Sequence, residues 1–213
     1  MVKEALVVKR DTLLKDKSFE GFLPVLEYDY FPLILRHFEY HPRGEQLEHD
    51  VSLKQIIPYV WIVNPRQKTV FLYKRSPNGN GKHGEYREIR YLNKYAGGVG
   101  GHIDRDTEEG VSDPVQHAMM RELEEEVEMP LYPQPKIIGY LNDNTDGLGM
   151  VHFGIVALAE THGPVSCRSA EGLSSGAFYS IDEVEHILAT PTNEVENWTR
   201  LSWSFVKAYL LKK

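Results

Sequence analysis

The sequence Arg121-Glu122-Leu123-Glu124-Glu125-Glu126 concentrates carboxylates on one predicted helix. In an α-helix, Glu122, Glu125 and Glu126 stand at positions i, i+3 and i+4, so their side chains converge on one patch. Like-charge pairs at this spacing each cost roughly 0.2 to 0.5 kcal/mol in an isolated helix. A bound cation would turn that repulsion into attraction. Oxygen ligands of this kind suit hard divalent ions, so we expect Mg²⁺, with Mn²⁺ as an alternative, and the phosphate chemistry that Mg²⁺ shares.

The acidic helix is predicted from Pro114 to Glu128, with Asp113 as its N-cap and Pro114 at the first helical position. Apolar residues at helical spacing form a stripe that faces the core: Val115, Met119, Leu123 and Val127. The three converging glutamates border this stripe, whereas Glu124 and Glu128 face water. Only the glutamates beside the core therefore need a partner.

The elements around this helix predict a single α/β architecture. Apolar and β-branched runs indicate strands over 56–63, 69–73, 137–141 and 151–159, of which the first two form a hairpin. Pro58 is expected at a strand start or edge. A capping box at 180–183 opens a helix to about Ala189. A last helix is predicted from about Val195 to Leu211, with a core-facing side that carries Trp198, Leu201, Phe205 and Tyr209, flanked by Ser202 and Val206. We expect an α/β/α sandwich with a mixed sheet.

Composition sets further bounds. With 213 residues, 41% of them hydrophobic, the chain can bury a full core, and we divide it into an N-terminal extension, 1–50, packed on a main domain, 51–213. The net charge of -7 argues against a nucleic-acid polymer or an anionic membrane surface as partner and leaves a small substrate. No signal region and no apolar run of the ~20 residues that span a bilayer are visible, so we expect a cytoplasmic protein. Cys167 is the single cysteine, so its thiol is expected to be buried or incidental.

The stretch from Gly101 to Met129 resembles the Nudix box of the Nudix (MutT-like) hydrolases, G-x5-E-x7-R-E-U-x-E-E-x-G-U with U aliphatic. Arg121-Glu122-Leu123-x-Glu125-Glu126 matches the centre of the box without a gap, and Gly100-Gly101-His102-Ile103-Asp104 resembles its glycine-led start. The resemblance extends to a Nudix-like order of strands over about residues 54–207. It implies a pyrophosphohydrolase that cleaves a phosphoanhydride bond in a nucleoside diphosphate linked to another group, or in a similar small phosphorylated metabolite.

The box departs from the family pattern in two places. Gly101 and Arg121 are 20 positions apart where the pattern gives 14, so residues 105–110 are interpreted as a six-residue insertion. The first glutamate of the pattern then becomes Asp113, and its late glycine becomes Glu128. These differences suggest a divergent branch, similar to predicted phosphoesterases, that keeps the R-E-x-x-E-E core.

The resemblance also implies roles for particular residues. The metal ion would be held by three carboxylates and one carbonyl, from Glu122, Glu125, Glu126 and Gly100. Arg121 would orient the glutamates through charge-assisted hydrogen bonds, and it would join Glu125 and Glu126 as a catalytic residue.

Further candidates lie outside the helix. Such enzymes often use a later acidic residue as base or ligand, and Glu171 is the candidate here, with Glu194 and Glu196 as alternatives. The anionic substrate would meet Arg75, Arg90 and Lys94, which precede the glycine cluster, and His102 beside it. For the three cations, an ordinary place on the surface is an equally good interpretation.

Other motifs are discounted. The segment 142–147 imitates the opening of an EF-hand loop but has Phe153 where a bidentate glutamate is required. The glycines at 97–101 do not follow the G-x-G-x-x-G order, and no G-x-S-x-G elbow supports a serine hydrolase. The histidines His102, His117 and His152 form no H-x3-H pair, so no zinc site is expected.

Two alternatives to an enzyme stay open. The insertion and Glu128 favour a Nudix-like domain that senses a nucleotide or phosphosugar without turning it over. The acidic run could also be a charged helix face with no ligand. A homodimer is common in the resembling family, and the aromatic segment 22–38 could supply its interface.

Overall fold

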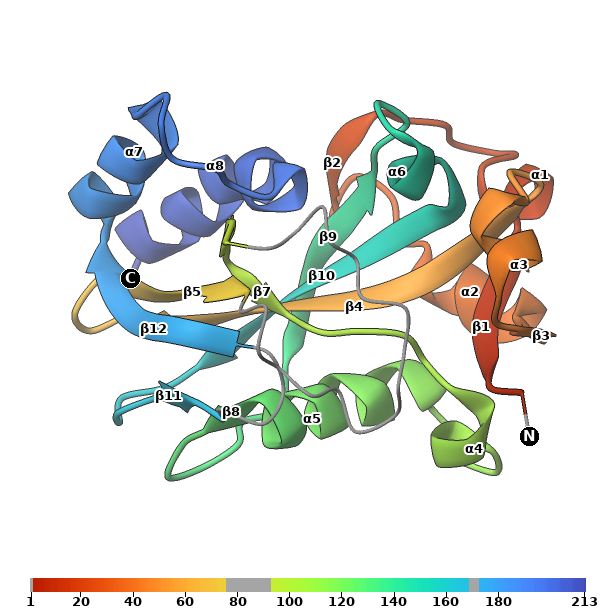
Figure 1. Ribbon diagram of the computed structural model, residues 1–213, viewed down its shortest axis with the longest axis horizontal. Helices are drawn as coiled ribbons and strands as arrows, with labels where there is room; N and C mark the ends of the chain where they lie inside the picture. Colours follow the sequence, from red (N-terminus) through yellow and green to blue (C-terminus); the bar gives the residue numbers. More distant parts are fainter. Residues whose placement is uncertain (1, 76–92, 169–172) are drawn as a thin grey trace. The chain divides into compact units, whose positions relative to one another are not determined.

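The computed structural model describes residues 2–75, 93–168 and 173–213, and Figure 1 shows its elements. The chain forms two compact units. Unit 1 comprises Met1–Tyr59, Gly100–Met119 and Lys136–Ala157, and unit 2 comprises Val60–Val99, Met120–Pro135 and Leu158–Lys213. Three elements contribute residues to both units: β4 (Leu53–Asn64), α5 (Pro114–Glu126) and β10 (His152–Glu160).

Unit 1 contains most of the N-terminal elements and the strands that pair with them. Its further elements are β1 (Glu4–Lys9), α1 (Arg10–Leu13), β2 (Gly21–Pro24), α2 (Phe31–His37), β3 (Glu39–Pro42), α3 (Glu45–His49), α4 (Arg105–Glu108), β9 (Lys136–Asn142) and α6 (Gly147–Val151). β1 pairs antiparallel with β3 and with the start of β4, and β2 pairs antiparallel with β9. The strands β4, β10, β9 and β2 follow one another as hydrogen-bonded neighbours.

An aromatic cluster joins the N-terminal segment of unit 1 to its strands. The ring of Tyr30 lies 5.1 Å from that of Tyr140 on β9 and 5.2 Å from that of Phe153 on β10, in edge-on contacts. Phe19 packs on the same tyrosine at 5.7 Å. Tyr30 is fully buried, so this aromatic residue of the segment 22–38 packs within the unit.

Unit 2 is built on the predicted hairpin and closed by two helices. Its further elements are β5 (Thr69–Arg75), β6 (Tyr95–Ala96), β7 (Gly98–Val99), β8 (Val127–Glu128), β11 (Ser166–Cys167), β12 (Leu173–Ser180), α7 (Ile181–Ala189) and α8 (Asn197–Leu211). β4 and β5 pair antiparallel as predicted, through a turn in which the Asn64 side chain accepts the Gln67 N–H at 3.2 Å. The predicted capping box of Ser180 and Glu183 is present and opens α7.

The layers of unit 2 agree with the predicted sandwich. β12, β5 and β4 are neighbours in that order, and Figure 1 shows α7 and α8 on one side of these strands and the end of α5 on the other. The predicted α/β class, a mixed sheet with helices, is confirmed. In the part of the chain that the structure describes, no helix is long and apolar enough to cross a bilayer.

The helix α8 buries a different face from the one predicted. Phe205, assigned to the core side, is exposed, whereas the buried residues are Thr199, Ser202, Trp203, Val206 and Leu210. The indole N–H of Trp61 donates to the Ser202 hydroxyl at 3.0 Å, and the ring centroids of Trp61 and Trp203 lie 6.0 Å apart. The Trp61 ring thus contacts one small and one large residue of this face, Ser202 and Trp203.

Two glycines of the predicted cluster are required by close approach. A Cβ on Gly97 would lie 2.3 Å from the Trp61 ring, and the Gly97 N–H donates to the Thr199 hydroxyl at 3.0 Å. A Cβ on Gly100, which has a φ of +156°, would lie 1.9 Å from the Pro58 carbonyl oxygen. Pro58 itself lies inside β4 and not at a strand start, between the residues that pair with β1 and those that pair with β7. Pro58 is therefore absent from the residue pairs that β4 makes with β1 and with β7, so its missing N–H removes no bond from either ladder.

We expect Gly97→Ala to destabilise the protein by roughly 1 to 3 kcal/mol, because the added methyl group overpacks the Trp61 ring. Urea unfolding followed by tryptophan fluorescence measures the change. Gly147→Ala is the matched control, since a Cβ there meets nothing within 4 Å. Equal stability of the two variants would show that Gly97 is not held by this contact.

Candidate active site

The acidic helix α5 begins where the sequence predicts and ends two residues earlier. The Gln116 N–H donates to the Asp113 side chain at 2.9 Å, which confirms the N-cap. The helix stops at Glu126 because Val127 and Glu128 form β8 and pair with β11, with Glu128 opposite Ser166. Glu128 is absent from the described residues with positive φ, so its place in the box needs no glycine.

Arg168 closes the C-terminal end of α5. Its backbone N–H donates to the Glu126 carbonyl at 2.8 Å, and its Nε donates to the Val127 carbonyl at 3.1 Å. The guanidinium also donates to the Tyr132 hydroxyl, which itself donates to the Val127 carbonyl. Carbonyls that a helix end leaves without intrahelical partners are thus satisfied by one arginine and one tyrosine. Sequence reasoning missed this arginine, although it stands three positions before the candidate Glu171 in the sequence.

The glutamates of α5 fall into two populations. Glu122 and Glu126, one turn apart, are 7% and 8% exposed, whereas Glu124 and Glu128 are exposed. Glu125 lies between these extremes, with 44% of its side chain accessible. The predicted border of the apolar stripe is confirmed for the two buried carboxylates, and Glu125 occupies its solvent side.

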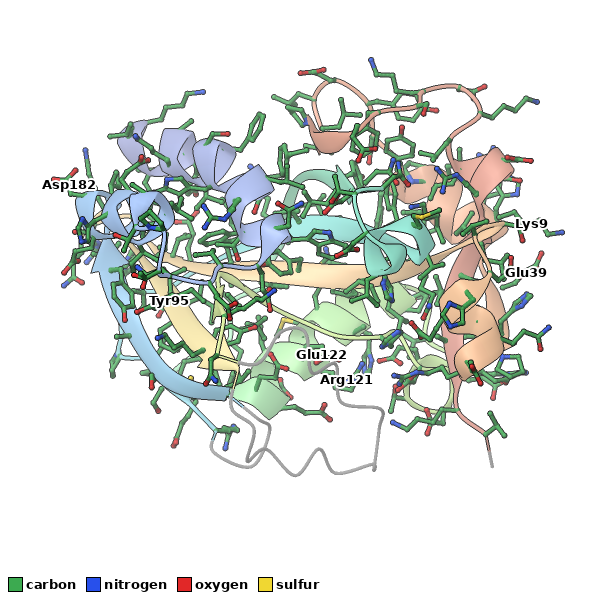
Figure 2. All side chains as sticks on the ribbon, turned by 45° about the horizontal axis from the view of Figure 1, so that its top comes forward. Lys9, Glu39, Tyr95, Arg121, Glu122 and Asp182 are labelled. Carbon is green, nitrogen blue, oxygen red and sulfur yellow. The ribbon has the colours of Figure 1, made fainter. Side chains whose placement is uncertain are left out.

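Arg121 links two of the carboxylates. Its Nη1 donates to Glu122 at 2.9 Å and to Glu125 at 3.1 Å. Figure 2 shows Arg121 and Glu122 extending from α5. Three carboxylates and one guanidinium leave a formal charge of minus two in this set of four side chains. The set therefore attracts a cation even after the arginine has been counted.

The direction of the helix strengthens that attraction. α5 has no acidic residue in its first turn and no basic residue in its last turn, so its glutamates crowd the negative end of the helix dipole. Each charge placed against the dipole costs about 0.3 to 1 kcal/mol when exposed. A cation bound at this end gains from the carboxylates and from the dipole together.

The donor set of α5 fits a hard divalent metal ion. Carboxylate oxygens are the ligands that Mg²⁺ and Mn²⁺ prefer, and two of the three are already removed from water. Glu122, Glu125 and Glu126 would hold such an ion.

Gly100 and His102 belong to unit 1, where the structure explains each by local contacts. Gly100 fits against the Pro58 carbonyl. The His102 Nε2 lies 2.8 Å from the Gln55 side-chain oxygen. Burial, with the nearby Arg43 and His152, holds the pKa of His102 well below its usual value, so the imidazole is neutral at physiological pH.

Lys94 and the two alternative acids belong to unit 2, where the backbone of Tyr95, the residue after Lys94, pairs with that of both acids. The Tyr95 N–H donates to the Glu194 carbonyl at 2.9 Å, and the Glu196 N–H donates to the Tyr95 carbonyl at 3.0 Å. Glu196 is 5% exposed, and Glu194 is exposed. Three of the predicted side chains lie outside the described ones: Arg75, Arg90 and Glu171.

The structure also shows buried acids that sequence reasoning missed. Asp104 forms ion pairs with Lys3 at 3.3 Å and Arg43 at 3.4 Å. Glu108, on α4 within the predicted insertion, is 1% exposed and lies 3.5 Å from the His117 ring. Neither acid stands in a helical pattern with its partners, so no local spacing could have identified it.

Comparison of the sequence with known proteins finds a curated relative. No protein-family model matches the sequence. The curated protein YmaB of Bacillus subtilis (strain 168) is 33% identical over 148 residues, which are 68% of this chain and 61% of the relative's own length. The match thus spans less than two thirds of that relative.

One solved structure, Tm1382, identifies the fold. Tm1382, provisionally assigned as a Nudix hydrolase, superposes with a TM-score of 0.76 over 97% of this chain and 99% of its own, at 24% identity. The Nudix domain of Shewanella oneidensis NrtR, solved with ADP ribose, gives a TM-score of 0.49 at 17% identity over 74% of this chain and 88% of its own. The chain has the fold of the Nudix hydrolases.

We expect Glu126→Gln to leave the free energy of unfolding unchanged or raise it by up to about 1 kcal/mol in EDTA, because it relieves repulsion at the helix end. Mg²⁺ should stabilise the parent protein and not this variant. Urea unfolding with EDTA and with MgCl₂ measures both effects.

Glu124→Gln is the control, because Glu124 lies on the same helix with an exposed side chain. It should keep the gain from Mg²⁺. A Glu126→Gln variant that Mg²⁺ stabilises as strongly as the parent would exclude Glu126 from the metal site.

Proposed function

We propose that the protein is a Mg²⁺-dependent pyrophosphohydrolase, with Mn²⁺ as an alternative ion. Its substrate is a nucleoside diphosphate linked to another group, or a similar small phosphorylated metabolite. The proposal rests on one observation above all: Glu122 and Glu126 are buried one turn apart at the negative end of α5, beside Arg121. A helix that served stability alone would be better without this arrangement.

The side chains of α5 support this chemistry in different ways. Glu122 and Glu126 are fixed by burial, which suits ligands that must keep one position. Glu125 combines a hydrogen bond to Arg121 with an accessible carboxylate, which suits a group that takes a proton from the attacking water. The metal ion, when bound, neutralises the diphosphate and lowers the pKa of its water.

Arg121 acts in this scheme as a positioning residue. One Nη1 atom restrains Glu122 and Glu125 together, so the two carboxylates keep their spacing while their mutual repulsion is reduced. The Gly100 carbonyl is the further ligand that the family resemblance implies. Glu171 stays the proposed later acid, with Glu194 and Glu196 as alternatives.

The substrate and its surroundings follow from charge. An overall charge of -7 suits a small anion carried with its metal ion better than a nucleic-acid polymer. Arg75, Arg90, Lys94 and His102 stay the proposed substrate-binding residues. A cytoplasmic location and a homodimer complete the proposal.

We expect the double variant Glu125→Gln, Glu126→Gln to lose kcat by at least about two orders of magnitude while remaining folded, because the lost charges neither hold the ion nor accept a proton. The assay is phosphate or nucleotide release from dinucleotides, nucleotide sugars and damaged nucleoside triphosphates with Mg²⁺ and with Mn²⁺. Glu124→Gln and Glu128→Gln, which change exposed charges on the same segment, should retain activity.

Two results would contradict the proposal. Turnover in the double variant equal to the parent's would remove α5 from the chemistry. Thermal stabilisation of the parent by a nucleotide, with no product released from any substrate of the panel, would identify a sensor instead.

A further inference from the structure

Three side chains from distant parts of the sequence meet in unit 1. Glu48 lies on α3, His102 follows β7, and His152 begins β10. Each offers one ligand atom, and the three atoms lie within 4.8 Å of one another. The two imidazole rings stand edge to face with centroids 5.6 Å apart. None of these residues lies on the acidic helix. Glu48 and His152 have no part in the proposed hydrolysis, and His102 is shared with its proposed substrate-binding residues.

Each imidazole has one nitrogen directed at an oxygen that can accept its hydrogen. His152 Nδ1 lies 2.9 Å from the Leu148 carbonyl oxygen, which accepts and cannot donate. His102 Nε2 lies 2.8 Å from the Gln55 amide oxygen. A neutral imidazole that donates through one nitrogen carries its lone pair on the other. The contacts therefore orient lone pairs on His152 Nε2 and His102 Nδ1.

Gln55 orients two of the three side chains. It is fully buried on β4, and its amide nitrogen donates to the Glu48 carboxylate at 3.3 Å while its amide oxygen faces His102. Amide and carbonyl acceptors behind the imidazole are the usual outer support of a histidine metal ligand, because they fix its tautomer and ring plane.

The backbone of His152, the third of these residues, is also fixed. Lys54, fully buried beside Gln55, donates to the Gly149 carbonyl at 2.8 Å and to the His152 carbonyl at 3.2 Å. The nearby cations Lys3 and Arg43 do not dominate the charge here, because both form ion pairs with the Asp104 carboxylate.

We propose that Glu48, His102 and His152 bind a transition-metal ion of the zinc type. Two imidazole nitrogens and one carboxylate oxygen are a common protein ligand set for zinc, and hard ions such as Mg²⁺ prefer oxygen alone. Ligands at 2.0 to 2.2 Å from a tetrahedral ion lie roughly 3.3 Å apart, so side-chain rotations within the 4.8 Å limit bring them together. The fourth position is left for water or a substrate oxygen.

The test uses the full chain carrying Glu125→Gln and Glu126→Gln, so that the acidic helix does not compete for the ion. Calorimetric titration with ZnCl₂ after removal of bound metal should give one Zn²⁺ per chain with micromolar or tighter affinity, and MgCl₂ should give no binding at this site. Adding His152→Ala should weaken Zn²⁺ binding at least tenfold. Gln55→Ala should weaken it by roughly 10- to 100-fold without removing a ligand.

Matched controls keep this test decisive. His186→Ala, which removes an exposed histidine of unit 2, should bind Zn²⁺ like the background protein. Thermal melting in EDTA checks that each variant folds, and Glu48→Gln replaces His152→Ala if the latter does not. No Zn²⁺ binding to the background protein, or equal binding after loss of a folded ligand variant, would show that the three side chains form a hydrogen-bonded network only. Loss of hydrolytic activity is not a readout, so failure of the proposed hydrolysis leaves this result unaffected.

Discussion

Burial of like charges at the wrong end of a helix is the constraint around which the α5 region is arranged. Leu123 and Val127 are fully buried and fix the rotation of the segment, so Glu122 and Glu126 cannot turn into water without exposing the apolar stripe. The helix must then tolerate the carboxylates where its dipole is negative. Arg121 offsets part of that cost, and the pairing of β8 with β11 ends the helix before the dipole grows further.

The contacts at the end of α5 explain why a glutamate in place of the late glycine does not disrupt the helix. The pattern of the box has a glycine at the position of Glu128. Here Glu128 enters a short strand, and Arg168 supplies the donors that the last carbonyls need. An extended residue tolerates any side chain, so the glycine position can hold an exposed glutamate. The predicted insertion at 105–110 has its own reason to be ordered, since Glu108 within it is buried beside His117.

The sequence predicted correctly those features of the fold that depend on interactions between residues close together in the chain. The N-cap Asp113, the capping box of α7, the β4–β5 hairpin and the burial of Glu122 depend on residues within a few positions of one another. The buried face of α8, in contrast, involves a contact with a residue far away in the sequence. Its sequence offers apolar residues on several sides, and the buried face is the one whose Ser202 hydroxyl accepts from Trp61, about 140 positions earlier in the chain, while Phe205 is exposed.

The two candidate metal sites differ in how sequence could find them, and they differ in the ion they would select. The α5 set is contiguous and made of oxygen donors, whereas the set of unit 1 combines residues some 50 positions apart and includes two imidazoles. First-row transition ions bind most protein ligands more tightly than Mg²⁺, so a lone carboxylate site would be open to capture by zinc. His102, supported by Gln55, would offer zinc a nitrogen donor that α5 lacks. Separation of nitrogen and oxygen donors into two sites would give each ion a preferred place on the same chain, and it would leave the carboxylates of α5 to the ion of the proposed phosphate chemistry.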